Sequence, residues 1–96
     1  MLELTGRVIA IDNLDPFETK NGYIYQRIIV IEYDNVFNNK THSHSTPFVR
    51  KALGEYPKMY CQVGDEVTIS FTIESRQNDN MRWYNNLIAH RITKNT

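Results

Sequence analysis

Aromatic and cationic residues alternate at three places in this chain: YIYQR at 23–27, FVRK at 48–51, and the stretch 76–84 that ends in RWY. Flat rings stack on nucleic-acid bases and Arg or Lys side chains contact phosphates, so this mixture is typical of proteins that bind single strands. Stacking contributes about 1–3 kcal/mol per base, which makes three rings significant even in a neutral protein. The candidate binding residues in these stretches are Tyr23, Tyr25, Arg27, Phe48, Arg50, Lys51, Arg76, Arg82, Trp83 and Tyr84.

Packing within a sheet is the alternative explanation for the same rings. Tyr and Trp favour strands and are intermediate in burial, so any single ring has even odds of being a packing residue. Tyr23 and Tyr25 share a strand face with Arg27, so we expect that face not to be deep core along its whole length. Trp83 and Tyr84 point to opposite sides, which lets one of them face inward while the other faces outward.

Residues suited to catalysis or metal binding are few. His42 and His44 are two apart and would share one face of a strand, but no third ligand follows at a metal-site spacing and no CxxC or HExxH motif occurs. Cys61 lies in the apolar context MYCQV, which is typical of a small buried residue. No nucleophile elbow or glycine-rich phosphate loop is present. The sequence therefore predicts a protein that is not an enzyme and uses no metal or cofactor.

Composition restricts the class of protein further. A chain of 96 residues predicts a single domain, 1–96, and 11 Lys and Arg balance 11 Asp and Glu. This balance argues against tight, charge-driven binding to duplex DNA and leaves room for a local basic strip. A single cysteine allows no internal disulfide, which favours a reducing compartment. With no basic leader and no apolar run of roughly 20 residues, we expect a cytoplasmic protein without a membrane partner.

The elements that must position the candidate residues are mostly strands. The stretch 2–12 alternates in hydrophobicity, and Gly6 within it predicts a bulge or a bend. Residues 23–34 are β-branched and aromatic, as in a long strand. In 67–74, apolar residues (Val, Ile and Phe) alternate strictly with polar ones, as in a strand with one buried face. Asn and Asp at 78–80 then predict a turn into a return strand.

Two segments between these strands lack a clear period. The polar segment 34–46 is rich in Asn, Ser, Thr and His, which predicts a loop or an extended excursion. We expect a short strand at 45–50, followed by a short helix or an irregular link that Gly54 and Pro57 limit. About five strands favour a closed antiparallel barrel over a sandwich, because sandwiches usually need about seven.

The commonest barrel of this size is the five-stranded oligonucleotide/oligosaccharide-binding (OB) fold. A bent first strand lets such a barrel pair one strand with two neighbours. The hairpin tip between Arg76 and Trp83 would then be the loop between the fourth and fifth strands, which flanks the ligand groove. The alternative is a hairpin whose charges discourage edge-to-edge pairing.

The segments GRVIAI, KNGYIYQRIIVIE, YPKMYCQVGDEVTISFTIESR and RWYNNLIAHRI resemble, in order and spacing, a family of small OB-fold proteins of Bacteroidetes and their phages. That family is a domain of unknown function similar to bacterial single-stranded DNA-binding proteins. The resemblance covers 4–94 and is most specific over 63–92. It implies single-stranded DNA binding in replication, repair or recombination, inside a bacterial cell or a phage-infected host. By position, it assigns stacking and phosphate contacts to Tyr25, Arg27, Phe48, Arg50, Arg76, Arg82 and Trp83.

The resemblance also bears on assembly. Bacterial single-stranded DNA-binding proteins form dimers or tetramers through the barrel, and the largely uncharged stretch 23–33 would serve that purpose if its edge were exposed. Typical members of the wider group end in a long tail with an acidic tip, whereas this sequence ends in HRITKNT. We expect a homo-oligomer that binds single-stranded DNA, with RNA as a second ligand.

Two other functions remain open at this point. Tyr, Trp and Arg are also enriched at protein interfaces, and the net charge of zero favours an OB module that binds protein, such as an assembly or inhibitor subunit. A barrel that binds sugars or small molecules has only the fold in its favour, and a fold does not determine function.

Overall fold

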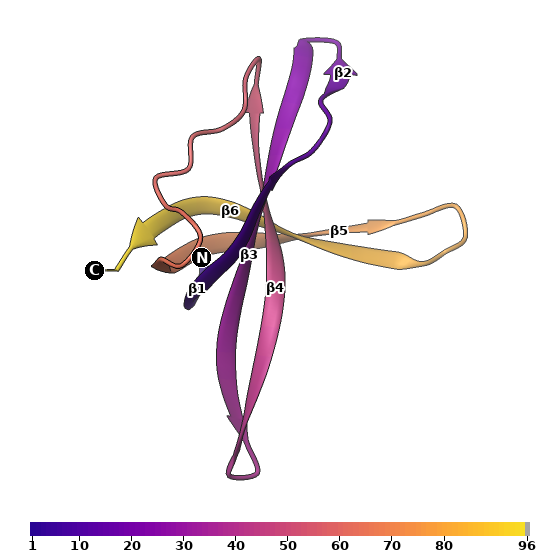
Figure 1. Ribbon diagram of the computed structural model, residues 1–96. Coiled ribbons are helices and arrows are strands. Elements are labelled where there is room, and N and C mark those ends of the chain that lie inside the picture. The colour runs from indigo at the N-terminus through magenta and orange to yellow at the C-terminus, as the bar shows by residue number, and fades with distance from the viewer. Residues whose placement is uncertain (96) are drawn as a thin grey trace.

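The computed structural model describes residues 1–95, which form six strands and no helix (Figure 1). The strands are β1 (Leu2–Asn13), β2 (Phe17–Thr19), β3 (Gly22–Phe37), β4 (Lys40–Leu53), β5 (Glu66–Gln77) and β6 (Trp83–Lys94). Five of them close into a barrel in the order β1-β5-β6-β4-β3-β1, in which only the β4–β6 pair is parallel. The predicted five-stranded barrel is confirmed and is consistent with an OB fold.

The barrel closes because β1 bends. Its first half, from Leu2 to Arg7, pairs with β5, and its second half, from Arg7 to Asn13, pairs with β3, with a shift in register between Val8 and Ala10. Gly6 lies where β1 crosses β3, and a Cβ atom there would collide with the carbonyl oxygen of Glu32 and the side chain of Ile31. Only glycine lets the two backbones approach this closely, so the predicted bend at Gly6 is confirmed.

The core of the barrel is aliphatic except for one ring. The buried residues are Val8, Ile29, Ile31, Phe48, Val67, Ile69 and Ala89. Phe48 has no exposed surface and packs edge-on against Phe71, with 5.0 Å between ring centroids. The prediction that Phe48 stacks on a base is therefore wrong. Position 48 alternates with cations in the sequence, but it lies on the side of β4 that faces the interior.

An irregular link of residues 54–65 joins β4 to β5 and packs against the barrel. Met59 and Cys61 contact the core, and the hydroxyl of Tyr56 donates a hydrogen bond to the carbonyl oxygen of Leu14 at 2.7 Å. Of the two predicted alternatives for this segment, a short helix or an irregular link, the structure has the irregular link. Residues 1–95 include no helix with the length and apolar character that a membrane crossing requires.

Two hairpins extend beyond the barrel as two-stranded arms, seen projecting in different directions in Figure 1. In the β3–β4 arm, 33–37 pairs with 40–44 past the last β1 contact, and in the β5–β6 arm, 73–77 pairs with 83–87. Of the two predicted forms of 34–46, a loop or an extended excursion, the structure has the second: paired strands around a turn at Asn38 and Asn39. Both asparagines have positive φ, as the tight hairpin turn requires.

The pairing of β3 corrects one expectation about assembly. β3 lies between β1 and β4 through most of the barrel, and β2 covers its beginning from Gly22 to Ile24. Within the barrel, the stretch from Tyr23 to Glu32 is therefore mostly flanked on both sides, and it does not offer the long exposed edge that assembly through it would need.

Candidate nucleic-acid interface

The β5–β6 arm carries the most exposed rings among the predicted site residues. Trp83 is 67% exposed and Tyr84 52% exposed, although they are adjacent at the start of β6. They lie on opposite faces of the arm, because successive side chains of a strand point to opposite sides. Trp83 is paired with Gln77, and Tyr84 is paired with Arg76. Neither ring faces inward, since at this point the hairpin has left the barrel and has no core to face.

The turn that joins the two strands of the arm is organised by the side chain of Asn78. Its Oδ1 accepts hydrogen bonds from the backbone N–H groups of Asn80 (3.0 Å) and Arg82 (2.9 Å). Its Nδ2 donates to the hydroxyl of Tyr84 at 3.0 Å. Asn78 therefore holds the backbone of Arg82 and the ring of Tyr84 in a fixed arrangement. This is a local Asx turn, as the Asn-Asp-Asn composition predicts.

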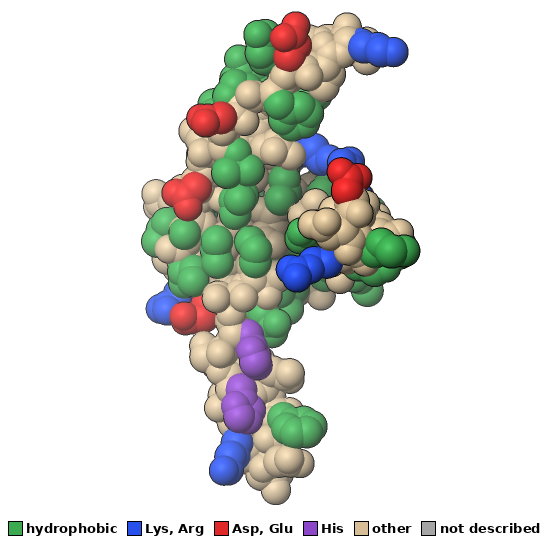
Figure 2. All heavy atoms as spheres, turned by 90° about the vertical axis from the view of Figure 1, so that its right-hand side faces the viewer, with side chains coloured by type: hydrophobic (Ala, Val, Ile, Leu, Met, Phe, Trp, Pro, Cys, Tyr) green, Lys and Arg blue, Asp and Glu red, His purple; other side chains and the backbone are tan. Residues whose placement is uncertain are grey.

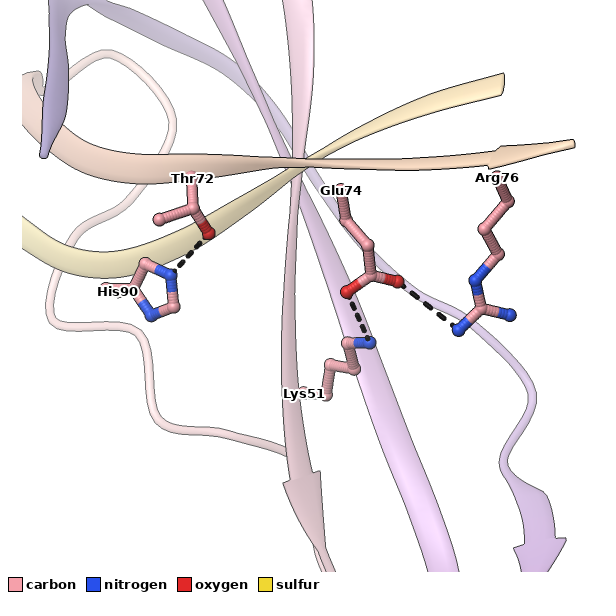
Figure 3. A network of polar contacts seen from close by, with 5 residues as sticks. All are labelled: Lys51, Thr72, Glu74, Arg76 and His90. Carbon is pink, nitrogen blue, oxygen red and sulfur yellow. Dashed lines mark hydrogen bonds and ion pairs between the residues drawn. The ribbon is translucent and has the colours of Figure 1, made fainter. Parts of the chain in front are cut away.

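The cations beside the arm are partly paired (Figure 3). Glu74 of β5 lies 3.3 Å from Arg76 on the same strand and 3.9 Å from Lys51, which comes from β4. The carboxylate thus links the arm to the barrel wall and offsets one of the two positive charges. Exposed pairs of this kind contribute about 0–1 kcal/mol, so both cations remain available to a competing phosphate. Arg82 forms no ion pair with any residue of the described chain, 1–95.

The barrel wall next to the arm is aliphatic. On β3 and β4 the residues that alternate with the core side chains are Gln26, Ile28, Val30, Pro47, Val49 and Lys51. Ile28 and Val49 are opposite one another and half-buried. Figure 2 views the side from which the arm projects and shows apolar side chains across the middle, with cations bordering the arm. Sequence reasoning missed Ile28 and Val49, although the two-residue period opposite the core would have indicated them.

The remaining predicted residues lie on a different surface. Tyr25 packs edge-on against Tyr56 of the link, with ring centroids 4.9 Å apart, and Nη1 of Arg27 donates to the carbonyl oxygen of Pro57 at 3.3 Å. Arg50 pairs with Arg27 across the two strands, and Tyr23 lies further out on the same face of β3. The expectation that this face is not deep core is confirmed. These residues therefore lie on the face of β3 and β4 opposite to that of Lys51, and they do not form one site with the β5–β6 arm.

The β3–β4 arm brings further rings together. His42 and His44 share a face, as predicted, with ring centroids 6.4 Å apart, and His44 lies 5.6 Å from the ring of Tyr33. Figure 2 shows histidine side chains along this arm. Within residues 1–95 no group of three His, Cys, Asp or Glu side chains is placed to hold a metal ion.

Cys61 has the one titratable group whose pKa is clearly displaced in the described chain. Burial raises the pKa of the thiol, the carboxylate of Asp65 raises it further, and the charges of Arg27, Arg50 and Lys94 act in the opposite direction. The thiol is therefore protonated at neutral pH and serves as a small packing residue, as its apolar sequence context predicts.

Comparison with known families places this chain in one of them. Residues 3–93 match the model of a family described as Domain of unknown function (DUF3127), and the chain belongs to that family. A search of curated proteins finds no match to the sequence. The predicted membership of a family of unknown function is confirmed. The likeness to bacterial single-stranded DNA-binding proteins and the bacterial or phage origin stay predictions.

Proposed function

We propose that this member of the DUF3127 family is a non-enzymatic cytoplasmic protein that binds single-stranded DNA with little sequence preference, in replication, repair or recombination. The observation that carries the proposal is the tip of the β5–β6 arm. There Trp83 and Tyr84 are exposed on a hairpin with no core to pack against, beside Arg76 and Arg82. Exposed rings next to cations are the combination that holds single strands.

The path of the strand follows from the geometry of the arm and the barrel wall. An OB barrel binds its ligand on the face of its second and third strands, which here are β3 and β4, between two flanking loops. The β5–β6 turn is one of these loops, and the segment from Leu14 to Asn21 that contains β2 is the other. Bases would stack on the rings of the arm and then lie against Ile28 and Val49, while phosphates contact the flanking cations.

The charge distribution limits the strength of binding. The whole chain is neutral, and Glu74 competes with phosphate for two of the three cations of the interface. Each barrel would therefore bind weakly, and several barrels in one homo-oligomer, a dimer or a tetramer, would act together. The free edges for such assembly lie on the two arms, since β3 is central. Stacking on bases does not distinguish sugars, so RNA is expected to bind as well.

A protein-binding module is the second candidate, and one observation favours it. The centre of the barrel wall presents aliphatic side chains, Ile28, Val30 and Val49, in place of the aromatic rings that stack on bases. An apolar centre bordered by charged residues is the usual anatomy of a protein interface. The two functions differ in their response to salt, because only phosphate contacts release counterions. Three contacts to a single strand predict a slope of about −2 for log K against log salt.

The test compares the tips of the two hairpins. The double variant Arg82→Ala/Trp83→Ala removes a cation and a ring from the β5–β6 arm, and Phe37→Ala/Lys40→Ala removes the same chemistry from the turn of the β3–β4 arm. Binding of a fluorescent oligo-dT is followed by anisotropy, with folding checked by circular dichroism. We expect the first variant to bind about tenfold more weakly, which corresponds to 1.4 kcal/mol, and the second to bind like the wild type. Equal effects in both variants, or no binding by the wild type, would refute the assignment.

A further inference from the structure

Two arginines face each other across β3 and β4 beneath the link. Arg27 and Arg50 are directly opposite partners in the strand register, on the side of the sheet that carries the core residues Ile29 and Phe48 two pairs further along. Like charges placed directly opposite on a sheet destabilise it. The pair therefore needs compensation from a group that carries negative charge.

No carboxylate of the described chain supplies that charge. Among residues 1–95, neither guanidinium forms an ion pair, and the one hydrogen bond that they make runs from Nη1 of Arg27 to the neutral carbonyl oxygen of Pro57. The Nε of Arg27 is buried without a partner. A buried donor on a charged group that makes no hydrogen bond costs free energy, and such groups frequently mark the place where a protein binds an ion or a water molecule.

A small hollow opens beside the link residue Cys61. A cavity of about 220 Å³ is lined by Met59, Tyr60, Cys61, Gln62, Asp65 and Lys94. Neither arginine lines this cavity, but Cys61 does, and the charges of Arg27 and Arg50 lower the pKa of its thiol, which indicates that the pair lies in its neighbourhood. Asp65 is already 3.6 Å from Lys94 and accepts a hydrogen bond from the N–H of Gln62. Arg27 and Arg50 therefore have no carboxylate within ion-pair distance among residues 1–95.

We infer that Arg27 and Arg50 form a binding site for a phosphate monoester or free phosphate, separate from the β5–β6 arm. A phosphate monoester carries nearly two negative charges at neutral pH, which matches the two uncompensated guanidiniums, whereas a phosphodiester carries one. Guanidinium groups bind phosphate oxygens through paired, charge-assisted hydrogen bonds. The phosphate comes either from solution or from the 5′ end of a DNA strand, and in the second case the inference rests on the proposed function.

The single cysteine offers a direct reporter for this site. Phosphate bound at the arginines would neutralise the charges that favour the Cys61 thiolate, so alkylation of the thiol should slow. We would titrate the protein with inorganic phosphate at constant ionic strength, measuring heat by calorimetry and the alkylation rate in parallel. The variant Arg50→Gln removes one guanidinium, Arg50→Lys keeps the charge without the planar fork, and Arg82→Gln on the β5–β6 arm is the control.

For the wild type and Arg82→Gln we expect saturable binding with the same Kd and slower alkylation of Cys61. Binding by Arg50→Gln should be at least about tenfold weaker, the loss of one charge-assisted pair. Arg50→Lys should fall between the two and gives the same decision if Arg50→Gln does not fold. Absence of saturable heat in the wild type, or an equal loss in Arg82→Gln, would overturn the inference.

Oligonucleotides then distinguish the source of the phosphate and separate the two proposals. A 5′-phosphorylated oligo-dT that binds more tightly than its 5′-hydroxyl counterpart, with the preference lost in Arg50→Gln, supports the site and assigns it to a strand end. Equal binding of the two oligonucleotides by a protein that binds inorganic phosphate supports the site and assigns it to free phosphate. Phosphate binding without any oligonucleotide binding upholds the site at Arg27 and Arg50 and refutes the proposed function of the arm.

Discussion

Replacing Phe48 with alanine removes the largest of the fully buried side chains and leaves a cavity where β4 faces the core. Substitutions of buried Phe by Ala cost about 3–5 kcal/mol. The edge-on contact with Phe71 at 5.0 Å adds to the loss, since such pairs contribute about 0.5–1.5 kcal/mol beyond area burial. Domains of this size have a total stability of about 5–15 kcal/mol, so Phe48→Ala should lose a large part of it.

The matched comparison is Trp83→Ala, because this larger ring is 67% exposed on the β5–β6 arm. Substitutions at exposed sites usually change stability by less than about 0.5 kcal/mol. Urea unfolding followed by circular dichroism measures both variants, and Phe48→Leu, which refills much of the cavity, should recover part of the loss. A loss below about 1 kcal/mol in Phe48→Ala, or a loss in Trp83→Ala equal to it, would refute the division of these rings between core and interface.

Three further predictions follow from single positions. Gly6→Ala should destabilise the barrel by at least about 1–3 kcal/mol in thermal unfolding, the usual cost of overpacking, because the new methyl group meets the backbone of β3. Glu74→Gln should tighten binding of oligo-dT severalfold in an anisotropy titration, because it releases Lys51 and Arg76 for phosphate; weaker binding would contradict this role. The raised pKa of Cys61 favours the folded state while the thiol is protonated, so this contribution is present below the unfolded pKa of about 8.5 and is lost as pH rises through the folded pKa. The stability of the wild type relative to Cys61→Ala should therefore fall over that alkaline range, and a flat difference would exclude the effect.

The barrel was predictable where one strand face is buried and the other is wet. Val67 and Ile69 of β5 are in the core, as their alternation with polar residues predicts. Gly6 marked the bend because only a missing side chain allows β1 to cross β3 so closely. At Ile73 the same alternation continues, yet the side chain is exposed because β5 has passed the end of the barrel. Sequence period reports which side of a strand is apolar, and it does not report where the core ends.

The β3–β4 arm was missed for a related reason. Residues 33–37 and 40–44 pair with one another but pack against no third layer, so neither face needs to be apolar. A hairpin of this kind has no hydrophobic alternation, and its polar composition is the same as that of a loop. The pair of asparagines at 38 and 39 was the available signal, because both adopt the positive φ of a tight turn.

The sequence indicated which rings and cations are candidates for the site, but not which of them lie close together in the fold. The rings and cations of the β5–β6 hairpin lie together, but Tyr25 and Arg27 contact the link that follows β4. The position of that link depends on contacts between residues about 30 apart in the sequence, such as that of Arg27 with Pro57, which local patterns do not encode. Tyr25 within 23–27 thus has a packing role, whereas the rings and arginines at 76–84 lie on an exposed arm.

The fluorescence of Trp83 gives the most direct test of the proposed interface, because it is the only tryptophan in the chain. Its emission is followed during titration with oligo-dT at low and at moderate salt. The proposal predicts strong quenching, as the indole stacks on a base, and an apparent affinity that falls as the salt concentration rises. Unchanged emission at micromolar oligonucleotide, from protein shown to be folded, would contradict it and favour the protein-binding module.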